Sequence, residues 1–215
     1  MKYFFLKSFG FICCFISFLF FSGCASTNIT SFKDPDYENA KFNKILVLAN
    51  TTDLSDRKEL ESYMVSEFSN FGIIAMESFR LFPPTRNLSD QEMIDLLLKN
   101  HIDAIITINV GESGVEEVYI PRTGSETKTK GQVNTYGNTA NYKEKSTTTY
   151  YGGYTQKKPW AEFETKLFDV SNGNLVWIAS SFTGGNAYAN RSTIIYSYCL
   201  NTVEKLIEDG LITER

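Results

Sequence analysis

The sequence predicts an α/β fold, in which a β-α-β-α-β half with parallel strands is followed by antiparallel strands and a C-terminal helix, giving a mixed sheet packed by helices. Three observations predict it. A continuous apolar run at 44–49 is typical of a strand buried on both faces. Apolar residues then recur at helical spacing between short β-rich runs. Asn172-Gly173 separates two further strand-like runs and favours a type I′ hairpin turn.

The first half alternates strands and helices. After the strand at 44–49, we expect a helix over 55–71 with Ser55 as its N-cap and Gly72 at its end. Its apolar residues recur three and four positions apart. A short strand at 73–76 follows.

A second helix begins at Ser89, which has the capping-box spacing with Glu92. The strand expected at 103–110 completes the β-α-β-α-β series, whose crossovers should be right-handed and whose strands should be parallel.

The second half has the pattern of antiparallel pairing. Residues 115–120 are expected to form a strand, and 160–170 alternate apolar with charged residues. Across Asn172-Gly173, the run 175–178 should fold back on 167–170. A last helix over 191–209 ends at Gly210.

The N-terminus has the layout of a secretory signal. Lys2 and Lys7 precede an uncharged run that is too short to span a bilayer comfortably, since a spanning helix needs about 20 apolar residues. Phe21-Ser22-Gly23-Cys24 resembles the lipobox of bacterial lipoproteins. The resemblance implies removal of a signal peptide, residues 1–23, and lipidation (palmitate) of Cys24; an uncleaved anchor is the alternative. Ala25 and Ser26 resemble the sorting pattern for the cell outer membrane.

Residues 24–43 are polar, without a hydrophobic period, so we expect a lipidated cysteine followed by a flexible tether. Residues 44–212 are the right length for a single α/β periplasmic domain. Loss of Lys2 and Lys7 with the signal takes the formal net charge from −4 to −6. Such a charge disfavours nucleic acid as a partner. Cys199 has the helical spacing of a buried small hydrophobe.

The segment 123–158 is a polar insertion rich in Thr and Tyr, and it cannot bury a core of its own. Two interpretations stay open: a disordered insertion, or a partner-docking arm that orders on contact. Tyrosine rings are enriched at protein interfaces. The candidate partner-binding residues are Tyr136, Tyr142, Tyr150, Tyr151 and Tyr154.

No catalytic motif stands out. Phosphate-binding and nucleophile motifs are lacking, and His101, the only histidine, falls at an expected helix end. Glu116 and Glu117 are adjacent on an expected strand and point to opposite faces, so they cannot act as a pair. Either one could pair with Glu162 or Asp169 across the sheet. We expect no catalytic residues, no metal site and no cofactor.

The order of these elements looks like that of small, mostly uncharacterised bacterial outer-membrane lipoproteins. The segments that carry it are "KILVLAN", "DRKELESYMVSEFSNFGIIAMESF", "SDQEMIDLLLKNHIDAIITINV" and "ETKLFDVSNGNLVWIASS". More distantly, the plan is similar to the N-terminal domain of TolB, the penicillin-binding-protein activator lipoproteins and the curli-secretion lipoprotein. The resemblance implies a periplasmic module that binds other envelope proteins.

The sequence therefore favours a membrane-anchored lipoprotein whose non-catalytic periplasmic domain binds another cell-envelope protein, with the lipid bilayer as a second partner through Cys24. In a Gram-positive source the anchor would lie in the cell membrane. The alternative is an envelope hydrolase or a small-ligand-binding domain that uses carboxylates at strand ends.

Overall fold

The computed structural model describes residues 24–136 and 139–213, and the side chains of these except at 132–142. The expected signal peptide, 1–23, lies outside the described residues. The chain divides into two compact units. The body comprises the chain up to Val115 and from Lys158 onward, and the arm comprises Glu116–Lys157. Each is described by itself.

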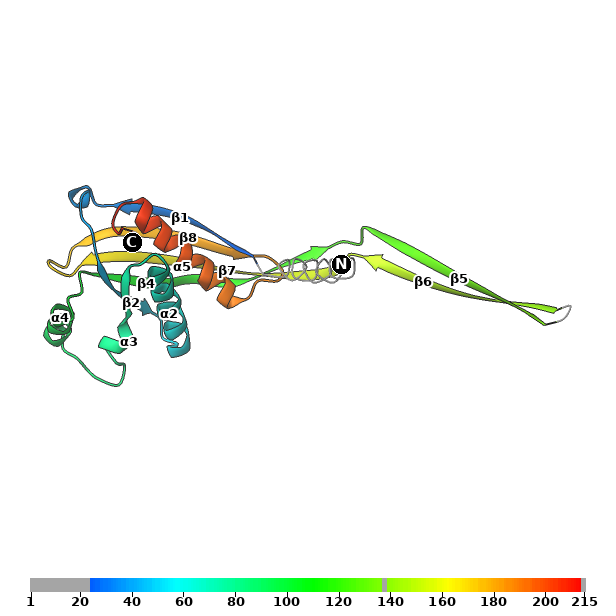
Figure 1. The fold of residues 1–215 in the computed structure, drawn as a ribbon, viewed down its shortest axis with the longest axis horizontal. Helices are drawn as coiled ribbons and strands as arrows, with labels where there is room; N and C mark the ends of the chain where they lie inside the picture. Colours follow the sequence, from blue (N-terminus) through cyan, green and yellow to red (C-terminus); the bar gives the residue numbers. More distant parts are fainter. Residues whose placement is uncertain (1–23, 137–138, 214–215) are drawn as a thin grey trace, which may run out of the picture. The chain divides into compact units, whose positions relative to one another are not determined.

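The predicted α/β class with a mixed sheet is confirmed. A six-stranded sheet has the order β1-β8-β7-β4-β2-β3. The pairs β2–β3 and β2–β4 are parallel, whereas β7–β8 and β1–β8 are antiparallel. Figure 1 shows the strands side by side with the helices packed on them. The strands are β1 (Ala25–Lys33), β2 (Lys44–Asn50), β3 (Ile74–Glu77), β4 (Ala104–Ile120), β7 (Tyr154–Asp169) and β8 (Leu175–Gly185).

The N-cap of helix α2 (Leu54–Asn70) lies two residues earlier than expected. Its N-cap is Asp53, whose Oδ1 accepts hydrogen bonds from the backbone N–H groups of Ser55 and Asp56 at 2.8 and 3.0 Å. The prediction of Ser55 as the cap is therefore wrong. The predicted end is confirmed, because Gly72 has φ +73°, a value that glycine adopts without strain.

The sheet has helices on both faces, and two short helices cover one end of the face that does not contact α2. These are α3 (Ser78–Leu81) and α4 (Asp90–Lys99), and the predicted capping box of Ser89 and Glu92 is present at the start of α4. Leu97 of α4 packs with Leu46 and Ile102 in a small buried cluster. The rest of this face, across β1, β8 and β7, is lined by polar and exposed side chains.

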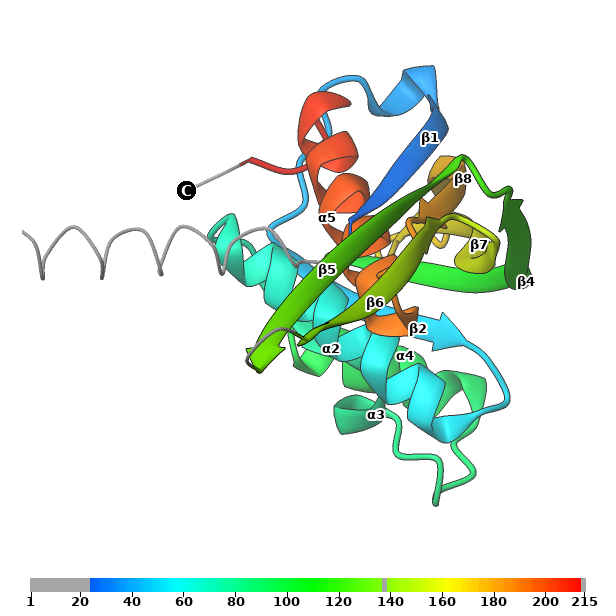
Figure 2. The ribbon, with the colours of Figure 1, turned by 90° about the vertical axis from the view of Figure 1, so that its right-hand side faces the viewer.

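The main core lies between the sheet and two helices, α2 and α5 (Arg191–Glu208). Figure 2 shows both helices on the same side of the sheet. Cys199 is fully buried in this core, and burial raises the pKa of its thiol. A thiol of that kind is unreactive at neutral pH, as the sequence indicated. No helix within residues 24–136 and 139–213 is long and apolar enough to cross a membrane.

The predicted β7–β8 hairpin is confirmed, with Leu167 opposite Trp177. Its turn differs from type I′, because only Gly173 has a positive φ, +76°, while Asn172 does not. A register shift between Leu167 and Phe168 accommodates the longer connection. Such bulged turns with one left-handed glycine are a common hairpin alternative.

The expected flexible tether is wrong over 25–33, because these residues form β1, an edge strand paired with β8 from Ala25↔Gly185 to Lys33↔Trp177. Its inward side chains are largely polar, so the sequence shows no alternation of apolar and polar residues there. These polar side chains find hydrogen-bond partners in the core: Thr27 Oγ1 lies 2.9 Å from the hydroxyl oxygens of Thr183 and Ser197. The chain then turns through a 3-10 segment at Pro35–Tyr37 and buries Phe42.

Asp209 joins β1, β8 and α5. Ser31 Oγ donates to Asp209 Oδ2 at 2.6 Å, and Trp177 Nε1 donates to the same oxygen at 2.7 Å. Lys205 completes the set with an ion pair at 3.0 Å. Although partial burial acts to raise the pKa of Asp209, the hydrogen bonds from Ser31, Trp177 and Lys205 outweigh it and hold that pKa below its usual value.

Replacing this carboxylate is expected to loosen the edge strand. Asp209→Asn should lower the free energy of unfolding at pH 7 by about 1.5–3 kcal/mol, the range for hydrogen bonds to a charged group. Because the folded-state pKa is depressed, the stabilisation is fully present above the ordinary carboxyl value and is lost as pH falls through the folded pKa. Urea unfolding of the wild-type protein and of Asp209→Asn at pH 7 and pH 3 measures this pH-dependent stabilisation. Glu208→Gln, one position away and exposed, is the control, and an equal loss there would contradict the prediction.

Candidate functional site

Cys24, the predicted lipidation site, stands directly before β1 and is exposed. Its carbonyl oxygen accepts a hydrogen bond from the N–H of Asn186 at 2.9 Å. The next residue, Ala25, already pairs with Gly185 in the sheet. No flexible segment separates the sulfur atom from the folded body.

The arm contains an antiparallel hairpin of β5 (Gly124–Tyr136) and β6 (Thr139–Tyr151). Its register runs without a shift from Gly124↔Tyr151 to Tyr136↔Thr139. Hydroxyl pairs link the strands: Thr127 with Thr148 at 3.0 Å, and Thr129 with Ser146 at 2.8 Å. The polar insertion expected at 123–158 is thus largely strand, with no hydrophobic cluster among its described side chains.

A tight joint connects this hairpin to β4 and β7. Gly152 and Gly153 have φ +81° and +74°, and a Cβ atom at Gly152 would lie 2.1 Å from the carbonyl oxygen of Pro121. The N–H of Gly153 donates to the Ile120 carbonyl at 2.7 Å, and that of Thr123 to the Tyr151 carbonyl at 3.0 Å. Only glycine fits at Gly152. Gly152-Gly153, which lacks the spacing of a phosphate-binding loop, therefore serves to form a backbone turn.

Exposed tyrosines flank the joint. We call Tyr119, Tyr150, Tyr151 and Tyr154 the tyrosine base; each side chain is at least half exposed. The guanidinium carbon of Arg122 lies 4.9 Å from the centre of the Tyr150 ring, and Tyr151 donates a hydrogen bond to Glu126 at 2.9 Å.

Three of the five predicted tyrosines, Tyr150, Tyr151 and Tyr154, therefore gather near the joint. Tyr136 and Tyr142 belong to the hairpin strands, and their side chains lie outside the described residues. Sequence reasoning missed Tyr119 and Arg122. The apolar character of the run 115–120 was visible, but the turn that returns the chain beside it was not.

Carboxylates line a shallow hollow of about 460 Å³ on the uncovered face of the sheet. Glu162 and Glu164 are its carboxylates, and a stacked pair of rings, Trp160 and Phe182 with centroids 5.9 Å apart, lies on the same strands. Lys166 Nζ donates to Glu164 Oε1 at 2.6 Å. The Lys166 hydrogen bond, aided by one from Asn109, holds the pKa of Glu164 below its usual value, so this carboxylate is ionised at neutral pH.

The other carboxylates considered from the sequence do not form a reactive pair. Glu117 pairs with Lys157 at 3.3 Å within the arm. Glu116 is the preceding residue of β4, so its side chain points to the other face of the strand. His101 is exposed at the end of α4 with φ +54°. Over the described part of the chain, no group of three or more His, Cys, Asp or Glu side chains is placed to hold a metal ion.

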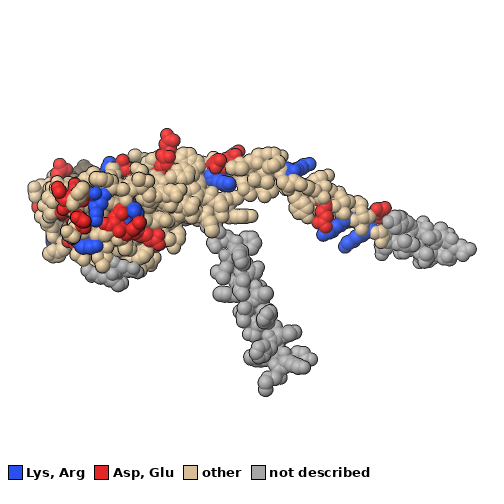
Figure 3. All heavy atoms as spheres, turned by 90° about the horizontal axis from the view of Figure 1, so that it is seen from above, with Lys and Arg blue, Asp and Glu red and all other residues tan. Residues whose placement is uncertain are grey.

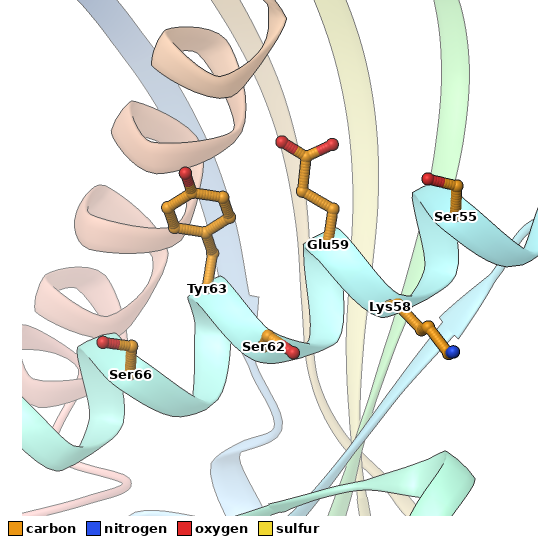
Figure 4. A pocket seen from close by; sticks show the side chains of 6 residues that line it. All are labelled: Ser55, Lys58, Glu59, Ser62, Tyr63 and Ser66. Carbon is orange, nitrogen blue, oxygen red and sulfur yellow. The ribbon is translucent and has the colours of Figure 1, made fainter.

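A second hollow, of about 520 Å³, lies along α2. Figure 4 shows Glu59 and Tyr63 directed toward the side where α5 runs, while Lys58 points away. Glu59 accepts a hydrogen bond from Ser192 at 2.7 Å, and Arg191 pairs with Asp56. These contacts tie α2 to α5, and the serines that complete the lining come from the same helix: Ser55, Ser62 and Ser66.

No family model matches the chain, and no curated protein matches it. Among solved structures, it is similar to a PelC dodecamer from Paraburkholderia phytofirmans, with 14% identity over 84% of this chain and 97% of that chain and a TM-score of 0.48. It is also similar to the lipoprotein GNA1162 from Neisseria meningitidis, with 16% identity over 78% of this chain and 99% of that chain and a TM-score of 0.40.

The joint offers a test of the arm. Gly152→Ala should distort it, because the added Cβ meets the Pro121 carbonyl in a backbone region that alanine avoids. We expect amide hydrogen exchange across 124–151 to accelerate roughly tenfold or more, as local opening becomes easier. Gly124→Ala is the matched control, since a Cβ there meets nothing within 4 Å. Equal exchange in the two variants would show that the joint does not hold the hairpin.

Proposed function

We propose that this chain is a lipoprotein of the cell outer membrane, held by an acyl group on Cys24, whose periplasmic domain binds another cell-envelope protein and carries out no catalysis. The observation that carries the proposal is the tyrosine base, a group of exposed rings around a joint that the backbone fixes. In this proposal the lipid anchor determines where the protein is located, and the arm provides the surface that binds the partner.

The placement of Cys24 supports direct anchoring. Each buried methylene contributes about 0.8 kcal/mol to membrane binding, so acyl chains on one cysteine retain a protein without a spanning helix. Because Ala25 is already paired with Gly185, the lipid would hold the sheet itself close to the bilayer. An acylated residue on a tether would leave the body free to drift.

The chemistry of the arm supports a protein partner. Tyrosine and arginine are enriched at the centres of protein interfaces, where amphipathic rings bury large areas and keep a polar end. An isolated two-stranded hairpin is only marginally stable in water. Contact with a partner would supply the burial that this hairpin lacks within one chain.

The alternative, an envelope hydrolase or a ligand-binding domain, draws on the hollow at Glu162 and Glu164. Hydrolysis by paired carboxylates needs one protonated acid. Glu164 is already ionised and engaged by Lys166 and Asn109, so it is unsuited to that role.

The anchor can be tested by metabolic labelling. In cells fed a labelled fatty acid, the wild-type protein should take up label and Cys24→Ser should take up none, because the thioether attachment needs the sulfur atom. Cys199→Ser is the control and should label normally, since Cys199 lies in the core. Undiminished labelling of Cys24→Ser would refute the anchor.

The tyrosine base can be tested by cross-linking in intact cells. The double variant Tyr150→Ala/Tyr154→Ala should reduce cross-linking to the envelope partner roughly tenfold or more, the loss expected when aromatic anchors are truncated. Tyr188→Ala removes a tyrosine of the body that is 74% exposed and should leave the yield unchanged. Identical partner profiles in the two variants would count against the arm.

A further inference from the structure

The outer edge of β5 has a charge pattern that is complementary to itself. The hairpin is a two-stranded sheet, so on the described residues each strand is paired along one side only. Unpaired strand edges are templates for pairing with another strand. Because side chains alternate along a strand, Glu126, Lys128 and Lys130 all lie on one face.

Symmetry restricts how two copies of one strand can pair. When identical strands meet antiparallel about a two-fold axis, the axis is perpendicular to the sheet, so each residue keeps its face in both copies. Directly opposite residues share a face, and their side chains interact: opposite charges stabilise the pair and like charges destabilise it. A register is therefore favourable only if acidic and basic residues of the same face meet.

The β5 edge satisfies this condition in one register. When Thr127 faces Thr127 of a second copy, Glu126 faces Lys128 and Lys128 faces Glu126, while Lys130 faces Gly124. A shift that brings Glu126 opposite Lys130 also puts Lys128 against Lys128. Both groups are exposed, with side chains 49% and 73% accessible for Glu126 and Lys128, and within one arm they pair with each other at 3.3 Å while Tyr151 donates to Glu126. Pairing between copies exchanges this ion pair within each arm for two ion pairs between the arms.

The β6 edge does not satisfy it. Glu144 lies between Lys143 and Lys145 and therefore points to the opposite face. No two-fold register can place this glutamate opposite either lysine.

We propose that two copies of this chain pair through β5, antiparallel about a two-fold axis at Thr127, to form a four-stranded sheet. Pairing would satisfy backbone groups along an edge that the two-stranded hairpin, only marginally stable by itself, leaves open. The pairing uses backbone groups and charges on the outer edge of β5, and it goes beyond the proposed function, which uses the tyrosine base.

Cross-linking at the axis tests the pairing. Full-length protein with Thr127→Cys, treated in membranes with a short bismaleimide, should yield a covalent dimer, because the two sulfur atoms lie opposite each other. Thr147→Cys is the matched control on β6 and should remain monomeric. No dimer from Thr127→Cys, an equal dimer from Thr147→Cys, or capture of a different protein would each overturn the proposal. The last outcome would leave envelope docking intact.

Charge exchange between copies tests the register. In the Thr127→Cys background, Glu126→Lys alone and Lys128→Glu alone should each reduce dimer yield roughly tenfold, since two attractive pairs become repulsive. Co-expression of the two variants with different tags should restore a mixed dimer, because lysines of one copy then face glutamates of the other. The ion pair within each arm, 3.3 Å in the structure, stays broken in both variants. Failure of the mixed dimer to recover would show that the register is wrong.

Discussion

The pairing of β1 with β8 is the interaction on which this account of the molecule depends. It places Cys24 at the start of an edge strand and fixes that residue to the sheet by nine consecutive residues of β1. Hydroxyl contacts of Thr27 and the carboxylate of Asp209 hold the inner side of β1 against β8 and α5. Without this pairing, an acyl group would hold only a loose N-terminal segment.

Much of the fold was predictable because its signals are local. Ser89 and Glu92 satisfy each other's backbone donors within one turn, and Gly72 and Gly210 adopt the positive φ values that end their helices. The alternation around Phe163 reports directly which side of β7 is buried. Such features need no knowledge of distant residues.

Most of the errors arose where distant residues decide the structure. The strand β1 is polar along its inner side, and only Thr183, Ser197 and Asp209, each far away in the sequence, make those positions suitable for burial. The cap of α2 is a choice between two good acceptors, Asp53 and Ser55, that spacing alone does not resolve. At Asn172-Gly173, the bulge at Leu167 and Phe168 depends on how β7 and β8 pair.

The candidate site shows the same division. The tyrosines of the insertion were visible as residue types, but the joint that gathers three of them with Tyr119 depends on Gly152 and its approach to Pro121. The role of Glu164 likewise depends on Lys166 and Asn109, which lie on the same and a neighbouring strand. Composition left a disordered insertion and a docking arm both open, and the backbone turn determines which tyrosines lie beside the joint.

The two compact units also differ in the charge of their side chains. Acidic side chains are numerous on the visible face of the body (Figure 3), whereas the hairpin strands carry four lysines against two glutamates. The arm is thus the part of the chain able to meet acidic or self-complementary surfaces. Its binding properties and the anchoring of the body are separable physical questions.

Hydrogen exchange of the β1 amides in the native, membrane-bound protein tests the central claim most directly. The account predicts strong protection of every second amide between Thr27 and Phe32, those that donate to β8, because β1 is an edge strand and its other N–H groups point away from the sheet. Exchange at the rate of an unstructured peptide would contradict it, because Cys24 would then be attached to the body by a free tether.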